Sequence, residues 1–111
     1  MNLSNVTTDK LALLYRNRDF SVTEVIHGVF DHIEKSDKGI HAFLSLNREK
    51  ALEEARRLDA RIASGETLDP LAGIPFAVKD NIVVRDTVTT CGSRILENFV
   101  APYTATAVER L

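Results

Sequence analysis

The feature that most constrains the fold of this chain is a helix signal between residues 21 and 39. Ser21-Val22-Thr23-Glu24 has the form of a capping box, in which the serine oxygen and the glutamate carboxylate accept hydrogen bonds from N–H groups at the helix start. Apolar residues then recur at helical spacing and form one broad face: Val22, Val25, Ile26, Val29, Phe30 and Ile33. We expect the helix to end near Gly39, which is free to take the left-handed conformation.

A shorter helix is predicted before this segment. Leu11, Leu14 and Tyr15 lie at helical spacing, and Thr7 or Thr8 precedes them as a possible N-cap. The polar residues 16–19 that follow do not continue the apolar face. They therefore indicate the turn between the two helices.

A third helix is predicted to begin after Asn47, a good N-cap residue, and to end near Gly65. Its apolar residues form a narrow stripe: Ala51, Leu52, Ala55, Leu58 and Ile62. The other faces are charged, and Glu53 lies four residues before Arg57, the order that favours an ion pair. This pattern is typical of a solvated helix that covers one face of a sheet. A helix that docks a partner subunit is the alternative.

Two short apolar segments, residues 41–46 and 74–79, are predicted to be strands. The crossover between them contains a helix, which favours parallel pairing of the strands around Phe43 and Phe76. The predicted fold class is therefore α/β, with helices on the faces of the sheet. A last helix is expected to start near Thr104 and to run to Leu111.

Composition excludes several classes of function. The chain has 14 Lys and Arg against 16 Asp and Glu, so it offers no basic footprint for nucleic acid. It has no apolar run long enough for a membrane span and no secretory signal, which indicates a cytoplasmic protein. A single cysteine, Cys91, excludes an internal disulfide. His27 and His32 point in different directions on a helix, so no metal site is predicted.

Lys79 ends the second predicted strand and shares its face with the small residue Ala77. A lysine at a buried strand end either extends to water or loses its proton and becomes a base; the residues alone favour the first outcome. Asp80 and Asn81 are expected to fix the following turn by local hydrogen bonds, with direct catalysis as the alternative. The small residues 89–93 allow the close backbone approach that active-site loops require. The alternative is an ordinary tight connection in which Cys91 is a small buried apolar residue.

The most specific motifs are Gly73–Ile82, with the sequence GIPFAVKDNI, and Thr89–Phe99, with the sequence TTCGSRILENF. They resemble the amidase signature family and, within it, the A subunits of tRNA-dependent glutamyl/aspartyl amidotransferases. The resemblance implies that residues 1–111 are the N-terminal portion of a single amidase domain, truncated at Leu111, with the first strands of a larger mixed sheet flanked by helices. It also implies that Lys79 is catalytic and acts with a relay serine and a nucleophilic serine, which would lie beyond Leu111.

The resemblance further implies a glutamine amidase that supplies ammonia to convert misacylated Glu-tRNA(Gln) or Asp-tRNA(Asn) to Gln-tRNA(Gln) or Asn-tRNA(Asn). The implied partners are the B and C subunits of a heterotrimeric, ATP-dependent amidotransferase, a carbon–nitrogen ligase that binds tRNA mainly through the partner subunit. ATP would be used at a partner subunit, so no cofactor is expected in this chain. We expect residues 1–111 alone to be inactive. A free-standing amidase of another carboxamide and a non-catalytic partner-docking module remain alternatives.

Overall fold

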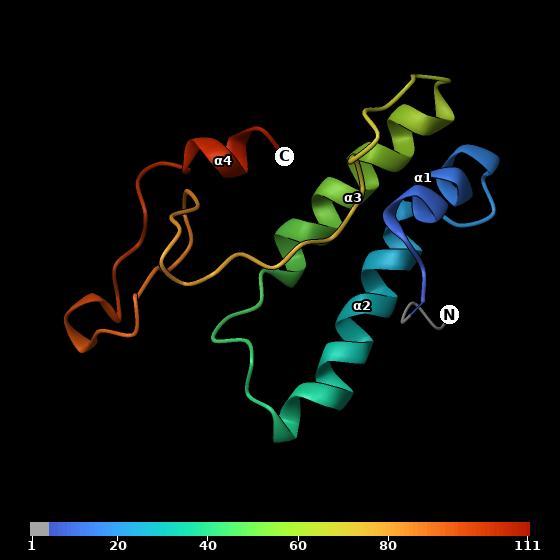
Figure 1. Cartoon of the computed structure of the whole chain (residues 1–111). Coiled ribbons are helices and arrows are strands. Elements are labelled where there is room, and N and C mark those ends of the chain that lie inside the picture. Colours follow the sequence, from blue (N-terminus) through green and yellow to red (C-terminus); the bar gives the residue numbers. More distant parts are fainter. Residues whose placement is uncertain (1–4) are drawn as a thin grey trace. The chain divides into compact units, whose positions relative to one another are not determined.

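The computed structural model describes residues 5–111. The chain forms two compact units, which meet in the sequence between Pro75 and Phe76. The first unit contains α1 (Thr8–Asn17), α2 (Val22–Ser36), the 3-10 turn η1 (Asp37–Gly39) and α3 (Arg48–Ala63) (Figure 1). The second unit contains the 3-10 turn η2 (Arg94–Leu96) and the short helix α4 (Thr106–Glu109), joined by irregular segments. No strand occurs between residues 5 and 111.

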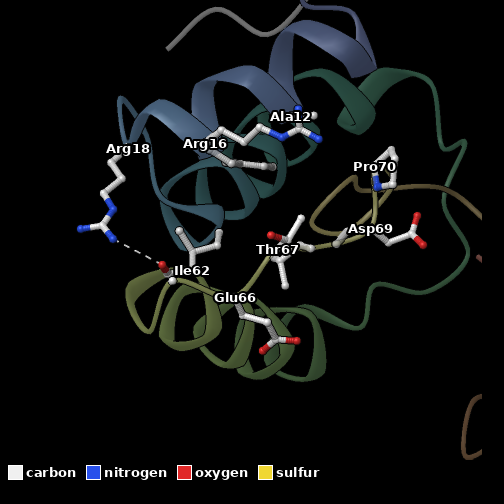
Figure 2. A pocket seen from close by; sticks show the side chains of 12 residues that line it. Ala12, Arg16, Arg18, Ile62, Glu66, Thr67, Asp69 and Pro70 are labelled. Atoms are coloured by element: carbon white, nitrogen blue, oxygen red, sulfur yellow. Dashed lines mark hydrogen bonds between the residues drawn. The ribbon is translucent and has the colours of Figure 1, made fainter.

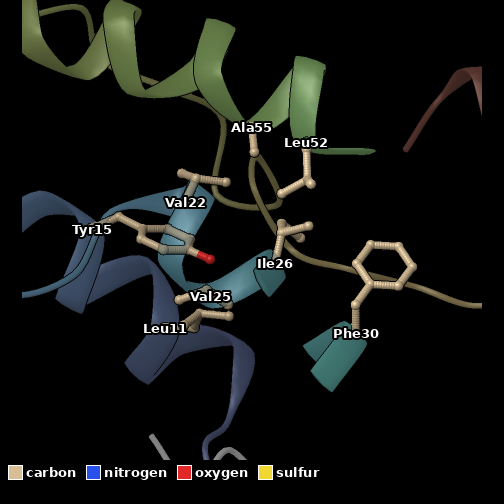
Figure 3. Packing of buried hydrophobic residues seen from close by; sticks show 8 residues of the cluster. All are labelled: Leu11, Tyr15, Val22, Val25, Ile26, Phe30, Leu52 and Ala55. Carbon is tan, nitrogen blue, oxygen red and sulfur yellow. The ribbon is translucent and has the colours of Figure 1, made fainter. Parts of the chain in front are cut away.

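The first unit is built on α2 and α3, which pack against each other and run in opposite directions (Figure 1). Buried side chains from all three helices of this unit form one apolar core (Figure 3). Its members are Leu11, Tyr15, Val22, Val25, Ile26, Phe30, Leu52 and Ala55. The three predicted helices are thus confirmed, and so is the packing of their apolar faces.

Two sets of hydrogen bonds hold the N-terminus of α2. The predicted capping box is present: Ser21 Oγ accepts from the Glu24 N–H at 3.1 Å, and Glu24 Oε2 accepts from the Ser21 N–H at 2.8 Å. The Ser21 hydroxyl also donates to Glu24 Oε2 at 2.8 Å. The bonds that the carboxylate accepts, from the Ser21 N–H and then from its hydroxyl, lower the pKa of Glu24. The carboxylate of Asp59, on α3, accepts from the N–H groups of Val22 at 2.7 Å and Thr23 at 3.0 Å. A side chain of α3 therefore caps α2.

We expect Asp59→Ala to destabilise the first unit by about 1–2 kcal/mol, because it removes the acceptor for orphan N–H groups of α2. A surface pair on the same helix supplies the control. Glu54 contacts Arg57 at 2.8 Å on an exposed face, so Glu54→Ala should cost at most about 0.5 kcal/mol. Hydrogen exchange at the α2 amides measures both effects. Equal protection in the two variants would contradict the capping role of Asp59.

The strand predicted for residues 41–46 is wrong. His41 has a positive φ of 54°, and Asp37 accepts hydrogen bonds from the N–H groups of Ala42 at 2.7 Å and Phe43 at 3.3 Å. The carboxylate thus takes donors that a sheet would have used. The left-handed residue that follows α2 and η1 is His41, whereas Gly39 was expected to take that conformation.

The strand predicted for residues 74–79 is wrong as well, and so is the parallel pairing around Phe43 and Phe76. The segment is extended, but a strand exists only where its backbone groups pair with a neighbouring chain segment. No such ladder occurs within residues 5–111. The described part of the chain is therefore helical with irregular segments, and the larger mixed sheet of the predicted α/β class is not present in it.

The second unit folds back on itself through backbone hydrogen bonds. An isolated antiparallel bridge joins Val88 to Val100. Beside it, the Thr89 N–H donates to the carbonyl of Phe99 and the Ala101 N–H donates to the carbonyl of Thr87, each at 3.0 Å. Thr89 and Ala101 are the buried residues of this unit. The predicted last helix begins at Thr106, as α4, and ends at Glu109.

Candidate functional site

The residue that the sequence singles out as catalytic, Lys79, lies at the end of the extended segment in the second unit. Its side chain is exposed and has no hydrogen-bond or ion-pair partner among residues 5–111. Its backbone is held, since the carbonyl of Lys79 accepts a hydrogen bond from the N–H of Ile82 at 2.9 Å. The amine of Lys79 is thus unpaired among the described residues, whereas the backbone carbonyl of the same residue is hydrogen-bonded.

Next to Lys79, the Asp80 carboxylate binds the loop around residue 90. Its Oδ1 accepts from the Thr90 N–H at 2.8 Å, and its Oδ2 accepts a short hydrogen bond from the Thr90 hydroxyl. The backbone carbonyl of Asp80 accepts from the Cys91 N–H at 3.0 Å. We call these three bonds the Asp80–Thr90 clamp. The carboxylate of Asp80 does form hydrogen bonds, but the prediction that they are local is wrong, because their partner is ten residues further along the chain.

The clamp keeps Asp80 ionised. The hydroxyl of Thr90 first, and then its backbone N–H, lower the pKa of Asp80 below its ordinary value because they stabilise the charged form. A carboxyl group with a lowered pKa stabilises the fold at pH values above its unfolded pKa of about 3.9. That contribution is lost as the pH falls through the folded value. The clamp is therefore intact at neutral pH.

The loop held by the clamp makes a tight left-handed turn. Cys91 has a φ of 51° and Gly92 a φ of 70°. The Gly92 N–H donates to Thr90 Oγ1 at 3.0 Å, and the Ser93 N–H donates to the Thr90 carbonyl at 2.8 Å. Cys91 is exposed, which corrects the interpretation of this residue as a small buried one.

A separate anchor lies in the first unit, where Gly73 packs against the helices. The Tyr15 hydroxyl donates a hydrogen bond to the Gly73 carbonyl at 3.0 Å. Burial, and then the charge of Asp59, raise the pKa of Tyr15, so the hydroxyl remains a donor. A Cβ at Gly73 would lie 3.0 Å from the Tyr15 ring and 3.1 Å from Val22. Both this close packing and the positive φ of 80° favour glycine at this position, six residues before Lys79.

The first unit also carries a surface cavity of about 280 Å³ (Figure 2). It lies between α1, the end of α3 and the loop of residues 65–72, and charged side chains of both signs surround it. Glu66 is paired with Arg61, and Arg18 donates to the carbonyl of Ile62. Neither Lys79 nor Asp80 lines this cavity. The mixture of positive and negative side chains around the cavity indicates no particular ligand.

The structure also bears on the expectations about metals, membranes and surface charge. No cluster of His, Cys, Asp and Glu suited to a metal ion occurs in the described part of the chain. Among residues 5–111, no helix is both long and apolar enough to cross a membrane. The predicted ion pair on α3 is confirmed, with 2.7 Å between Arg57 and Glu53. The charged face of α3 is thus partly neutralised by its own residues.

Comparison with known proteins places these features in a class. The family model described as Amidase matches residues 24–111, and the chain belongs to this family. Among curated proteins, the chain is 42% identical over 111 residues to the A subunit of the glutamyl-tRNA(Gln) amidotransferase of Natranaerobius thermophilus. It is 45% identical, also over 111 residues, to the protein of the same name from Moorella thermoacetica. In both cases the match covers the whole of this chain and 23% of the relative.

Solved structures agree with the family assignment. One, described as a vestigial protein complex that reveals the evolutionary origins of an s-triazine catabolic enzyme, matches 94% of this chain with a TM-score of 0.88 and 31% identity. A bacterial aryl acylamidase of the amidase signature family matches 86% of the chain with a TM-score of 0.82 and 29% identity. The matches cover 23% and 20% of those chains. The described residues thus have the fold of one part of a larger amidase.

Sequence reasoning identified Lys79, Asp80 and the loop of residues 89–93, but it did not connect them. The structure joins Asp80 to Thr90 and leaves Lys79 beside that junction. No periodic pattern signals such a contact, because both residues lie in irregular segments. The Asp–Thr pairing could have been suspected only from the affinity of a carboxylate for a hydroxyl and an N–H on one residue.

Proposed function

We propose that this chain is the N-terminal portion of a glutamine amidase that supplies ammonia, as one subunit of a complex, for the amidation of misacylated Glu-tRNA(Gln) or Asp-tRNA(Asn). The observation that carries the proposal is the match, along the whole chain, to proteins named as A subunits of glutamyl-tRNA(Gln) amidotransferase. The chain spans about a quarter of their length, at 23%. Residues that follow in such proteins would supply the relay and nucleophilic serines.

In this proposal Lys79 is the general base of the amidase reaction. A serine hydroxyl is a weak nucleophile until a neighbouring base takes its proton, and a lysine does so only in its neutral form. Among residues 5–111, the Lys79 side chain is exposed and has no ion-pair partner. No carboxylate of this part of the chain therefore stabilises the charged form of the amine.

The proposed partners are the B and C subunits of an ATP-dependent amidotransferase, with glutamine as the ammonia donor. The chain carries a net charge of −2, which supports binding of tRNA and ATP at a partner rather than at this chain. A role in tRNA amidation would place the complex in the cytoplasm. No cofactor is assigned to this chain.

A second candidate is a free-standing amidase that acts on another carboxamide. The likeness to a bacterial aryl acylamidase favours it, since that structure shares the fold of most of this chain. A non-catalytic docking module is the third possibility. The Arg57–Glu53 pair on the outer face of α3 would be available to such a partner.

The test is ammonia release by the full-length protein, alone and with the B and C subunits, from glutamine and from an aryl acylamide. We expect glutamine to be the better substrate and the subunits to couple its hydrolysis to formation of Gln-tRNA(Gln) or Asn-tRNA(Asn). Preference for the aryl substrate would favour the free-standing amidase. Residues 1–111 alone should release no ammonia, because a general base without a nucleophile performs no acyl transfer. Turnover by residues 1–111 that is lost in Lys79→Ala would contradict this prediction.

A further inference from the structure

We propose that Asp80 is a positioning residue for Lys79 and that it acts through the Asp80–Thr90 clamp. The inference rests on the proposed role of Lys79 as general base. It assigns Asp80 no contact with substrate and no proton transfer. The carboxylate of Asp80 fixes the backbone from which the Lys79 side chain extends.

The geometry of the clamp supports this role. Both donors of Thr90, its N–H and its hydroxyl, bind the Asp80 carboxylate, and the Asp80 carbonyl accepts from Cys91 as well. Hydrogen bonds to a carboxylate are stronger than those between neutral groups. On the other side of the residue, the Lys79 carbonyl is bonded to the N–H of Ile82. The backbone directly after the Lys79 Cα is therefore held by the Lys79 carbonyl and by Asp80, while the Lys79 side chain is left unpaired among the described residues.

The turn that the clamp holds is itself under constraint. Cys91 occupies the left-handed region at a φ of 51°, a conformation that residues other than glycine rarely adopt. Such a conformation persists where surrounding bonds determine it. The bonds from Cys91 and Gly92 to Asp80 and Thr90 supply that constraint. Loss of the carboxylate would remove two of the three clamp bonds and loosen the backbone beside Lys79, while the backbone bond between Cys91 and Asp80 stays.

The experiment measures kcat and KM of the full-length amidase with substitutions on both sides of the clamp. We expect Asp80→Ala to lower kcat by about 10²-fold with little change in KM, the scale of a misplaced catalytic group. Thr90→Val should lower kcat by about 10-fold, since it keeps the N–H and loses the hydroxyl. Thr90→Ser should keep the wild-type kcat, because serine retains both the hydroxyl and the N–H. The double variant Asp80→Ala/Thr90→Val should be about as slow as Asp80→Ala, because the bond between the Thr90 hydroxyl and the carboxylate is already absent in Asp80→Ala.

Matched controls come from the same unit. The Thr87 hydroxyl donates to the carbonyl of Val84 at 2.8 Å and takes no part in the clamp, so Thr87→Val should keep its kcat. Glu97→Gln neutralises an exposed carboxylate and should also be silent. Hydrogen exchange at the Thr90 amide, which should rise in Asp80→Ala, reports the clamp without reference to activity.

The outcomes separate this inference from the proposed function. Wild-type kcat in Thr90→Val and in a folded Asp80→Ala, with Lys79→Ala inactive, would overturn the positioning role alone. Losses that multiply in the double variant would overturn it too. Wild-type turnover of Lys79→Ala would instead overturn the proposed function. If Asp80→Ala does not fold, the loss in Thr90→Val and its recovery in Thr90→Ser decide the question.

Discussion

Lys79→Ala in the full-length protein is expected to lower kcat by about 10²–10⁴-fold, the usual effect of removing a positioned proton-transfer group. Lys79→Arg should be as severe, because a guanidinium stays charged in proteins and cannot accept the proton of a serine. The substitution should leave the fold of residues 5–111 unchanged, since the side chain is exposed and has no partner among these residues. Steady-state kinetics with glutamine measures kcat, and a thermal unfolding scan measures the stability of the fold.

The control for this experiment is a lysine of similar exposure outside the motif. Lys35 lies in the last turn of α2 and is exposed, so Lys35→Ala should keep full activity. Near-normal turnover in Lys79→Arg would show that the amine is not a general base. A loss in Lys35→Ala equal to that in Lys79→Ala would show that the assay reports general charge effects.

Gly73→Ala is expected to give the largest loss of stability among single methyl additions in the first unit. Its φ of +80° costs an alanine about 1–2 kcal/mol. The added methyl group would also meet the Tyr15 ring at 3.0 Å and Val22 at 3.1 Å, and such overpacking adds about 1–3 kcal/mol. The hydrogen bond from Tyr15 to the Gly73 carbonyl should weaken as the chain moves away. Hydrogen exchange at the α1 and α2 amides measures the loss.

Two other glycines separate the two contributions. Gly65 has a φ of +82° with open space around it, so Gly65→Ala carries the backbone cost alone. Gly39 has neither a positive φ nor a neighbour within 4 Å, so Gly39→Ala should be close to neutral. Equal effects in Gly73→Ala and Gly65→Ala would show that the contact with Tyr15 and Val22 is not tight.

The helices could be predicted from sequence because their signals are local. The Ser21–Glu24 capping box and the apolar face behind it lie within a few turns of one helix, and both are found as expected. The strands could not be predicted reliably, because a strand depends on partners far away in the sequence. For residues 41–46 a local acceptor, Asp37, competes for the backbone N–H groups, and hydrophobicity does not reveal such competition.

The candidate site shows the same division. The sequence motif identifies Lys79, but it does not predict which residues lie around Lys79. Asp80 was expected to make local hydrogen bonds, whereas its partner Thr90 depends on how the second unit folds back. The cap that Asp59 provides for α2 was also missed, since it joins residues 36 and 37 positions apart.

The bond between Tyr15 and Gly73 has a consequence for the order of folding. Its partners are 58 positions apart, so it closes a long loop, and the entropy of that closure must be met before the bond contributes. The helical hairpin of α2 and α3 forms from contacts much nearer in sequence, which makes it the faster step. The tyrosine and valine surface that receives Gly73 exists only once α1 and α2 have packed. We therefore expect Gly73 to dock last, onto helices that have already packed.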